Sequence, residues 1–282
     1  MVELTMELLG ELLSEPRLVD DFGRACLYVI FVTFVSFLVS FCFDLHTGRE
    51  LTLVPAADVT VEQRIDATDK VLLTPLFAVI GFLALTGSWE LRGDVESRWH
   101  GETPRTRWCA LLYCAKMLLD VPTQAYTLRG DAVKRLQMVG HHLLSFVAIG
   151  LGLVVKRSAF FACWAVCSEL STPFLNAVMA IKLFGGNATP AQKSCHMVAG
   201  TGLWLAYIPF RMALFPAWLW LWFDDQRTFP DRTTAVSSTF ELNFFPAVIA
   251  FLLALSTVWF YAITKGLAKA LGLIGPPKKK SS

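Results

Sequence analysis

Seven ionisable side chains lie within or at the ends of long apolar segments, and these are the residues best suited to chemistry: Lys116, Asp120, His141, His142, Glu169, His196 and Arg211. A charge inside a bilayer costs roughly 2.5–3.5 kcal/mol on insertion scales, so it is a functional candidate by default. A neutral imidazole can act as a base, a nucleophile or a hydrogen-bond partner, and a neighbouring carboxylate can orient it. We therefore predict a catalytic group of four residues: His141, His142, Asp120 and Glu169.

Structural roles for the same residues stay open. Lys116 and Asp120 are four residues apart, so they can pair on one helix face without doing chemistry. Arg211 can either neutralise Glu169 or bind an anionic headgroup, and we count Lys116 and Arg211 as candidate substrate-binding residues. Adjacent helical side chains point about 100° apart, so the histidine pair is not suited to chelating one metal together. The Cys and His spacing shows no pattern typical of a zinc site, and no metal is expected.

The composition requires that these residues lie in a membrane protein. The chain has 282 residues, of which 55% are hydrophobic and only 17% are charged, with a mean hydropathy of +0.52. Soluble proteins carry about 25% charged residues, so an ordinary soluble enzyme, a disordered chain and a disulfide-rich secreted module are all excluded. Spans need roughly 20 mostly apolar residues, and we predict seven transmembrane helices: 25–43, 71–89, 108–128, 138–155, 158–181, 194–223 and 242–264.

The predicted spans divide the chain into an amphipathic N-terminal segment (1–24), a first transmembrane helix with its loop (25–60), a main membrane domain (61–269) and a basic tail (270–282). The longest stretch outside the spans, 44–70, is too short for a domain with its own core, which needs about 50 residues. Any chemistry must therefore lie in or at the bilayer. Segment 194–223 contains Pro209 and Pro216, and is either one kinked helix or two short ones.

The distribution of basic residues and the end of the chain bear on the membrane topology and on the location in the cell. With seven spans and a cytosolic C-terminus, thirteen Lys and Arg residues fall on the cytosolic side and ten on the lumenal side, which is the bias of known membrane proteins. Lys279 and Lys280 resemble the dilysine signal that returns membrane proteins to the endoplasmic reticulum; a basic tail that touches anionic lipid is the alternative. A net charge of +2 gives no indication of a nucleic-acid partner.

Beyond these arguments, the chain resembles the TLC family. His141-His142 is followed some 25 residues later by Glu-Leu-Ser-x-Pro-x-x-Asn, which ends at Asn176 inside a span. Asp120 and Arg64 also match family positions, and residues 255–259 resemble a Leu-Asn-x-x-Trp pattern with Ser256 in place of Asn. The family includes ceramide synthases, translocon-associated membrane proteins and lipid-homeostasis proteins of the endoplasmic reticulum. The resemblance covers about residues 61–269 and implies an all-α bundle of six core helices around a lipid-accepting cavity, plus extra N-terminal helices.

The resemblance also implies a function. Ceramide synthases use the histidine pair to transfer an acyl group from acyl-CoA to a long-chain base, so His141 or His142 would activate the acceptor or hold the acyl group. Asn176 would contact the substrate, and acyl-CoA would be a co-substrate with no further cofactor. The Asp-rich motif of ceramide synthases is absent, and Glu169 is the one acid of the matching helix. This departure places the chain nearer the other branches of the family.

Two functions are therefore expected for a multi-pass protein of the endoplasmic reticulum membrane. The first is an acyltransferase of lipid metabolism and lipid homeostasis. The second is a non-catalytic protein that senses lipid or exports cargo toward the Golgi apparatus. The expected partners are membrane lipids, together with other membrane proteins or a second copy of the chain.

Overall fold

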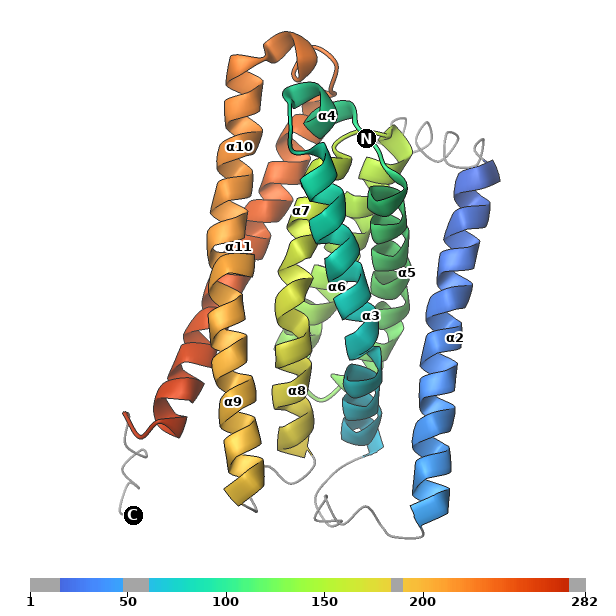
Figure 1. The fold of residues 1–282 in the computed structure, drawn as a ribbon, viewed down its shortest axis with the longest axis vertical. Helices are drawn as coiled ribbons and strands as arrows, with labels where there is room; N and C mark the ends of the chain where they lie inside the picture. The colour runs from blue at the N-terminus through green and yellow to red at the C-terminus, as the bar shows by residue number, and fades with distance from the viewer. Residues whose placement is uncertain (1–15, 48–60, 184–189, 274–282) are drawn as a thin grey trace.

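The computed structural model describes residues 16–47, 61–183 and 190–273, and these residues form seven antiparallel helical passes (Figure 1). In chain order the passes are α2 (Pro16–Thr47), α3 (Val61–Leu91), α5 (Pro104–Thr127), α6 (Ala132–Val155), α7 (Ala159–Val166) with α8 (Thr172–Leu183), α9 (Pro190–Tyr207) with α10 (Leu214–Thr228), and α11 (Thr239–Ala270). The short helix α4 (Val95–His100) lies at the upper end of the bundle. The described residues contain no strand, and the prediction of an all-α fold is confirmed.

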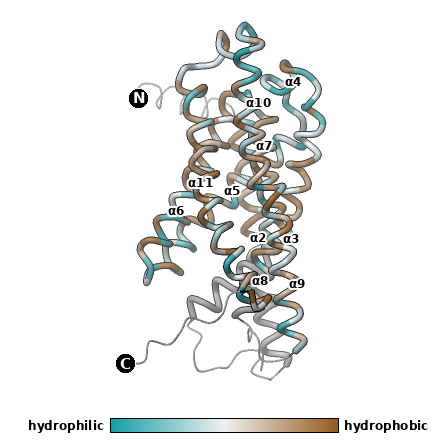
Figure 2. Tube along the Cα trace, turned by 90° about the vertical axis from the view of Figure 1, so that its left-hand side faces the viewer, coloured by the Kyte–Doolittle hydropathy of each residue, from teal (hydrophilic) through white to brown (hydrophobic). Residues whose placement is uncertain are grey.

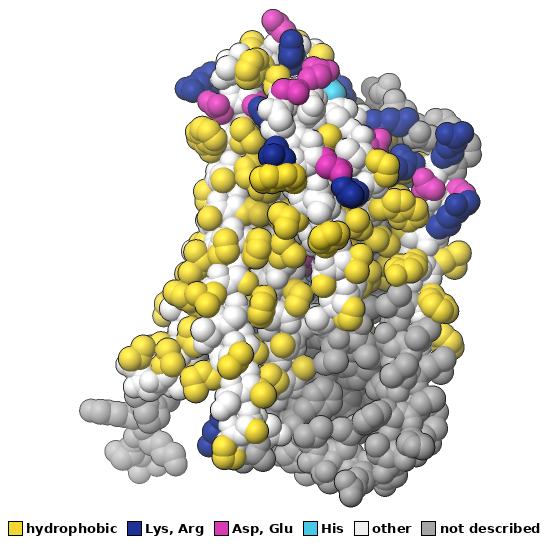
Figure 3. All heavy atoms as spheres, in the orientation of Figure 1, with side chains coloured by type: hydrophobic (Ala, Val, Ile, Leu, Met, Phe, Trp, Pro, Cys, Tyr) yellow, Lys and Arg dark blue, Asp and Glu magenta, His cyan; other side chains and the backbone are white. Residues whose placement is uncertain are grey.

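The helices are those of a membrane protein. Within the described residues, four segments are long and apolar enough to cross a bilayer, by length and composition alone: Thr74–Leu91, Ala132–Val155, Pro190–Thr228 and Thr239–Ala270. Hydrophobic residues follow the middle of the helices, and hydrophilic ones gather at the end that carries α4 (Figure 2). The same division is visible on the surface, where charged side chains crowd the α4 end above a broad apolar belt (Figure 3).

The remaining predicted spans run alongside these four. Helix α5 carries the buried Lys116 and Asp120, and the α7–α8 pass is interrupted, yet both pack against α3 inside the bundle. Helix α2 packs on α3 and α5. It begins at Pro16, so the predicted border between residues 24 and 25 falls within one helix. The rest of the predicted amphipathic segment, residues 1–15, lies outside the described residues, as do Lys279 and Lys280.

Polar caps at the sequence positions between spans explain where the helices start. Thr103 and Ser238 begin α5 and α11 with reciprocal capping boxes, and the side chain of Asp131 accepts a hydrogen bond from the backbone N–H of Lys134 at the start of α6. Such caps satisfy backbone donors that the first turn leaves unpaired.

Two passes contain a break in α-helical geometry, and the two breaks are in contact. The first is η1 (Cys167–Ser171), a 3-10 turn between α7 and α8. The second is η2 (Ile208–Ala213), a π turn between α9 and α10. Proline explains the position of both, because Pro173 falls in the first turn of α8 and Pro209 removes a backbone donor within η2. Segment 194–223 is thus one continuous rod, which settles the alternative left open by the sequence.

The α4 end is closed by a network that we call the α4-edge network: Arg98, Trp99 and Asp225. The buried carboxylate of Asp225 accepts hydrogen bonds from Arg98 Nε at 2.9 Å, from Arg98 Nη2, and from Trp99 Nε1 at 3.0 Å. The Trp99 ring packs on Trp222, with ring centroids 4.4 Å apart. This network joins α4 to the end of α10.

Candidate functional site

The first part of the predicted site lies between α5 and α6. Lys116 Nζ forms an ion pair with Asp120 Oδ1 on one face of α5, and both side chains are buried. The predicted pairing of these two residues is confirmed. His142 Nδ1 lies 3.7 Å from the other oxygen of Asp120, which is beyond hydrogen-bond distance. Asp120 is thus placed beside one histidine of the pair, with Lys116 balancing its charge.

The second part lies where η1 meets η2. Thr172 Oγ1 donates to Glu169 Oε2 at 2.5 Å, and Arg211 Nη2 lies 3.8 Å from Glu169 Oε1. Arg211 Nε also donates to Ser171 Oγ at 3.0 Å. Of the two roles left open for Arg211, the structure shows the one beside Glu169. Both breaks in helical geometry contribute to the site, because each turns polar side chains toward the other pass.

Close approach of α3 to η1 depends on a glycine. A Cβ atom at Gly81 would lie 2.7 Å from Leu170 Cδ2, which is closer than real Cβ contacts. The absence of a side chain at this position therefore lets α3 pack against the turn that holds Glu169 and Ser171. Asn176 lies further along, where its Nδ2 donates to Thr74 Oγ1 at 3.0 Å and ties α8 to α3.

The third part is His141. Its ring packs edge-on against His142, with centroids 5.3 Å apart, and against Trp259, with centroids 5.9 Å apart. Trp259 belongs to the motif singled out in the last span, so the two motifs meet. His141 Nδ1 is buried and has no hydrogen-bond partner among the described residues. As their helical spacing predicts, the two histidines face different surroundings.

A largely enclosed cavity of about 50 Å³, which we call the enclosed cavity, is lined by both His141 and Arg211. His141, Ser145, Ser168 and Arg211 line one part of it. The other part is walled by four aromatic side chains that pack on one another: Phe161, Trp218, Trp222 and Phe245. Its lining thus combines polar side chains with an aromatic wall.

The cavity gathers some of the predicted residues and not others. His141 and Arg211 line it, whereas Asp120, His142, Glu169, Lys116 and Asn176 do not. Glu169 lies beside Arg211, which lines the cavity, and Asp120 lies beside His142, which does not. No group of three or more His, Cys, Asp or Glu side chains within the described part of the chain is placed to hold a metal ion.

Sequence reasoning missed several residues at or beside the cavity. Tyr113 lines the cavity from α5, and Ser171, behind the wall, accepts a hydrogen bond from Arg211. Tyr113 carries no sequence signal, since isolated Tyr residues are common in helices, whereas Ser171 lies within the Glu-Leu-Ser motif but was not assigned a role. Trp218 and Trp222 did carry a sequence signal, because aromatic residues four positions apart share a helix face.

Comparison with known proteins yields one match. A family model described as the TLC domain matches residues 72–265. This range agrees with the expected extent of the resemblance, 61–269, and includes every predicted catalytic and substrate-binding residue. No curated protein and no solved structure matches the chain.

Proposed function

The chain belongs to the TLC-domain family of lipid-related membrane proteins, and from this premise we propose that it transfers an acyl group to a membrane lipid, with His141 as the base. The observation that carries the proposal is Nδ1 of His141, a buried nitrogen that has no partner in the described part of the chain and belongs to a ring that lines an apolar cavity. Buried polar atoms are nearly always paired. A nitrogen left unpaired beside a cavity is therefore available to a ligand.

Each step of the transfer can be assigned to a group of the cavity or of its substrates. The acceptor amine or hydroxyl gives its proton to His141, and its nitrogen or oxygen attacks the thioester carbonyl of acyl-CoA. The C–S bond breaks, and His141 returns the proton to the CoA thiolate. Arg211, the cation of the cavity wall, stabilises the oxyanion of the intermediate. The aromatic wall holds the acyl chain.

The other polar residues position these two groups. Ser171 and Glu169 fix the guanidinium of Arg211, while the Lys116–Asp120 pair lies beside His142. His142 supports His141 by packing against its ring. An endoplasmic reticulum location with a cytosolic C-terminus is part of this proposal, and its support is the dilysine-like tail and the charge bias of the loops.

A non-catalytic role has its own supporting observation, which is the size of the cavity. About 50 Å³ holds a few water molecules, so an acyl chain enters only if the aromatic wall moves. A cavity that widens on binding would couple lipid occupancy to the packing of α10 and α11. Such coupling is what a lipid sensor or a lipid-dependent cargo protein needs.

The deciding experiment is an untargeted lipid profile of cells that lack the protein. The cells are rescued at matched levels with wild type, His141→Ala, His142→Ala or the double variant. His196→Ala, on α9 outside the cavity, is the matched control. We expect wild type and the control to restore a specific acylated lipid, His141→Ala to fail and His142→Ala to restore it in part. Restoration by the double variant would favour the non-catalytic role.

A further inference from the structure

A second hollow lies on the outer surface, between α3, α7 and the η2–α10 segment, and has a volume of about 560 Å³. We call it the outer groove. Its walls are apolar from Cys167 and Pro209 up to Leu221, and Arg92 and Arg98 lie at its α4 end. None of its lining residues lines the enclosed cavity. The outer groove is therefore a separate site, open to the surroundings of the bundle.

The length of the outer groove matches one leaflet of a bilayer. Its wall on the η2–α10 segment runs from Pro209 to Leu221, which at 1.5 Å per residue is about 18 Å. The hydrocarbon core of a bilayer is about 30 Å thick, so one leaflet takes about 15 Å. An extended acyl chain would therefore lie along this wall with its polar end at Arg92.

The two arginines at the α4 end differ in what they can bind. Arg98 is held by the carboxylate of Asp225. Arg92 stacks on the ring of Trp89, with its Cζ 3.3 Å from the ring centroid, and donates to the Trp89 carbonyl. It forms no ion pair with any described residue, and it is exposed. Its guanidinium retains donors for an anion from outside.

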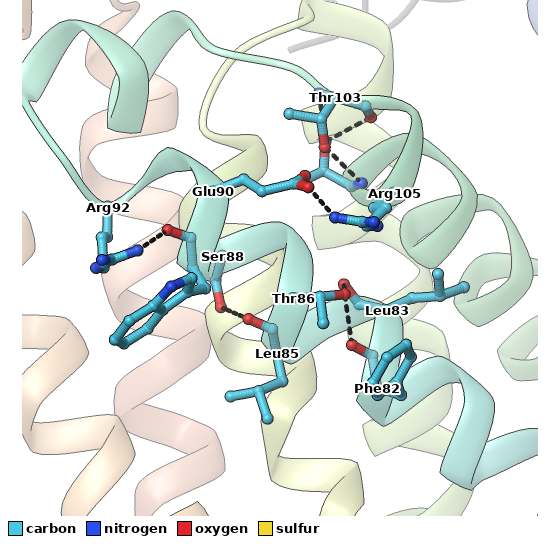
Figure 4. Close-up of polar contacts among 11 residues, drawn as sticks. Phe82, Leu83, Leu85, Thr86, Ser88, Glu90, Arg92, Thr103 and Arg105 are labelled. Carbon is cyan, nitrogen blue, oxygen red and sulfur yellow. Dashed lines mark hydrogen bonds and ion pairs between the residues drawn. The ribbon is translucent and has the colours of Figure 1, made fainter.

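The acids on either side of Arg92 in the chain, Glu90 and Asp94, both have other partners. Leu85, Ser88 and Arg92 lie on one side of α3, whereas Glu90 points to the other side and pairs with Arg105 (Figure 4). Trp89 is 63% exposed, as expected of an aromatic residue at the interface between headgroups and hydrocarbon. The outer groove thus combines an apolar channel, an interfacial aromatic ring and one unpaired cation.

We propose that the outer groove binds one phospholipid, with its phosphate on Arg92 and one acyl chain along α3 and α10. Arginine suits this role because its planar fork of donors binds phosphate oxygens in pairs. The channel cannot stay empty in a bilayer, and a phospholipid of the adjacent leaflet has both the length and the charge that the groove requires. This site does not depend on the histidine pair.

The test is native mass spectrometry of the delipidated full-length protein, titrated with dioleoylphosphatidylglycerol or with dioleoylglycerol, which has the same chains without the phosphate. We expect one tightly bound phosphatidylglycerol and little dioleoylglycerol. Arg92→Gln weakens phosphatidylglycerol binding about tenfold, because a charge-assisted contact is lost. Arg105→Gln, on the opposite side of α3, is its matched control. Ala217→Phe fills the channel and abolishes binding, while Ala250→Phe, on exposed α11 surface, leaves it intact.

Two results would overturn the proposal. One is equal binding of the two lipids by wild type, which would mean that the phosphate is not recognised. The other is binding of phosphatidylglycerol by Arg92→Gln as tightly as by wild type. Because Arg92 is exposed, this substitution is not expected to destabilise the fold. Retention by His141→Ala is expected, and it separates this site from the enclosed cavity. A phosphatidylglycerol lost in His141→Ala but kept in Arg92→Gln would place the bound lipid in the enclosed cavity instead.

Discussion

The α4-edge network and the enclosed cavity both hold buried charges on the same rod of helix, but they treat them differently. Asp225 accepts hydrogen bonds from three donors, two of Arg98 and one of Trp99. At the cavity, the guanidinium of Arg211 stays 3.8 Å from the carboxylate of Glu169, and His141 Nδ1 has no partner among the described residues. A buried polar network in which every group has a hydrogen-bond partner stabilises the fold. A network with an unpaired group keeps a donor or acceptor available to a ligand.

The largest effect is expected at the satisfied network. Asp225→Ala leaves the Arg98 guanidinium and Trp99 Nε1 without their acceptor, and losing one partner of a buried ion pair costs about 3–5 kcal/mol. Thermal unfolding in detergent should show this loss. Asp224→Ala is the matched control, because Asp224 forms a surface pair with the exposed Arg227, worth about 0–1 kcal/mol. Similar losses in both variants would contradict the distinction between the two regions.

Substitutions of Glu169 should lower the stability by less, and by different amounts for Ala and for Gln. Glu169→Ala leaves the cation of Arg211 and the hydroxyl of Thr172 unmatched, for a loss of roughly 3 kcal/mol. Glu169→Gln keeps an oxygen that can accept from Thr172, so its loss should be about 1 kcal/mol. Unfolding temperature and expressed level measure both. Equal losses would show that the negative charge itself holds Arg211 in place.

Packing behind the cavity gives the next effect. Gly81→Ala places a methyl group against Leu170, and overpacking of this kind costs about 1–3 kcal/mol. Since Leu170 lies between Glu169 and Ser171, lipid acylation should fall as well. Gly150→Ala is the control, because nothing lies within 4 Å of its added Cβ atom. Full acylation activity in Gly81→Ala would mean that η1 can shift without any effect on the reaction.

The smallest effect concerns an exposed cap outside the membrane segments. Hydrogen bonds from the Lys134 side chain and backbone lower the pKa of Asp131 below its ordinary value. A lowered pKa in the folded state means that the cap stabilises the first turn of α6 above the unfolded pKa of about 3.9. That stabilisation disappears as the pH falls through the folded value. Hydrogen exchange at the start of α6 should accelerate there, and in Asp131→Ala it should be fast already at neutral pH.

Composition and spacing predicted most of the fold. Long apolar segments fixed the order of the passes, and the four-residue spacing of Lys116 and Asp120 correctly predicted their pairing. The match of the TLC domain to residues 72–265 confirms the family inferred from His141-His142 and the Glu169 motif. These features could be predicted because each depends on residues close together in the chain.

Features that depend on contacts between distant segments could not be predicted. No spacing rule relates Ser171 to Arg211, forty residues later, although the two form a hydrogen bond. Which histidine faces the cavity depends on how α6 is rotated against α11, and the sequence gives no measure of that rotation. Pro173 and Pro209 did mark the two breaks, but not the fact that the breaks meet.

The π turn in the long rod also sets the direction of the residues that follow it. Side chains of a regular α-helix advance by about 100° per residue, and a π turn closes with one residue more than an α turn. The π turn therefore takes up one extra residue while α10 keeps the direction that a regular helix with one residue fewer would give it. Deleting one residue within Ile208–Ala213 would restore a regular helix and leave Trp218 and Trp222 facing the cavity. Forcing all six residues into α-helical turns without a deletion would instead rotate α10 by about 100°, and both rings would turn away from the cavity together.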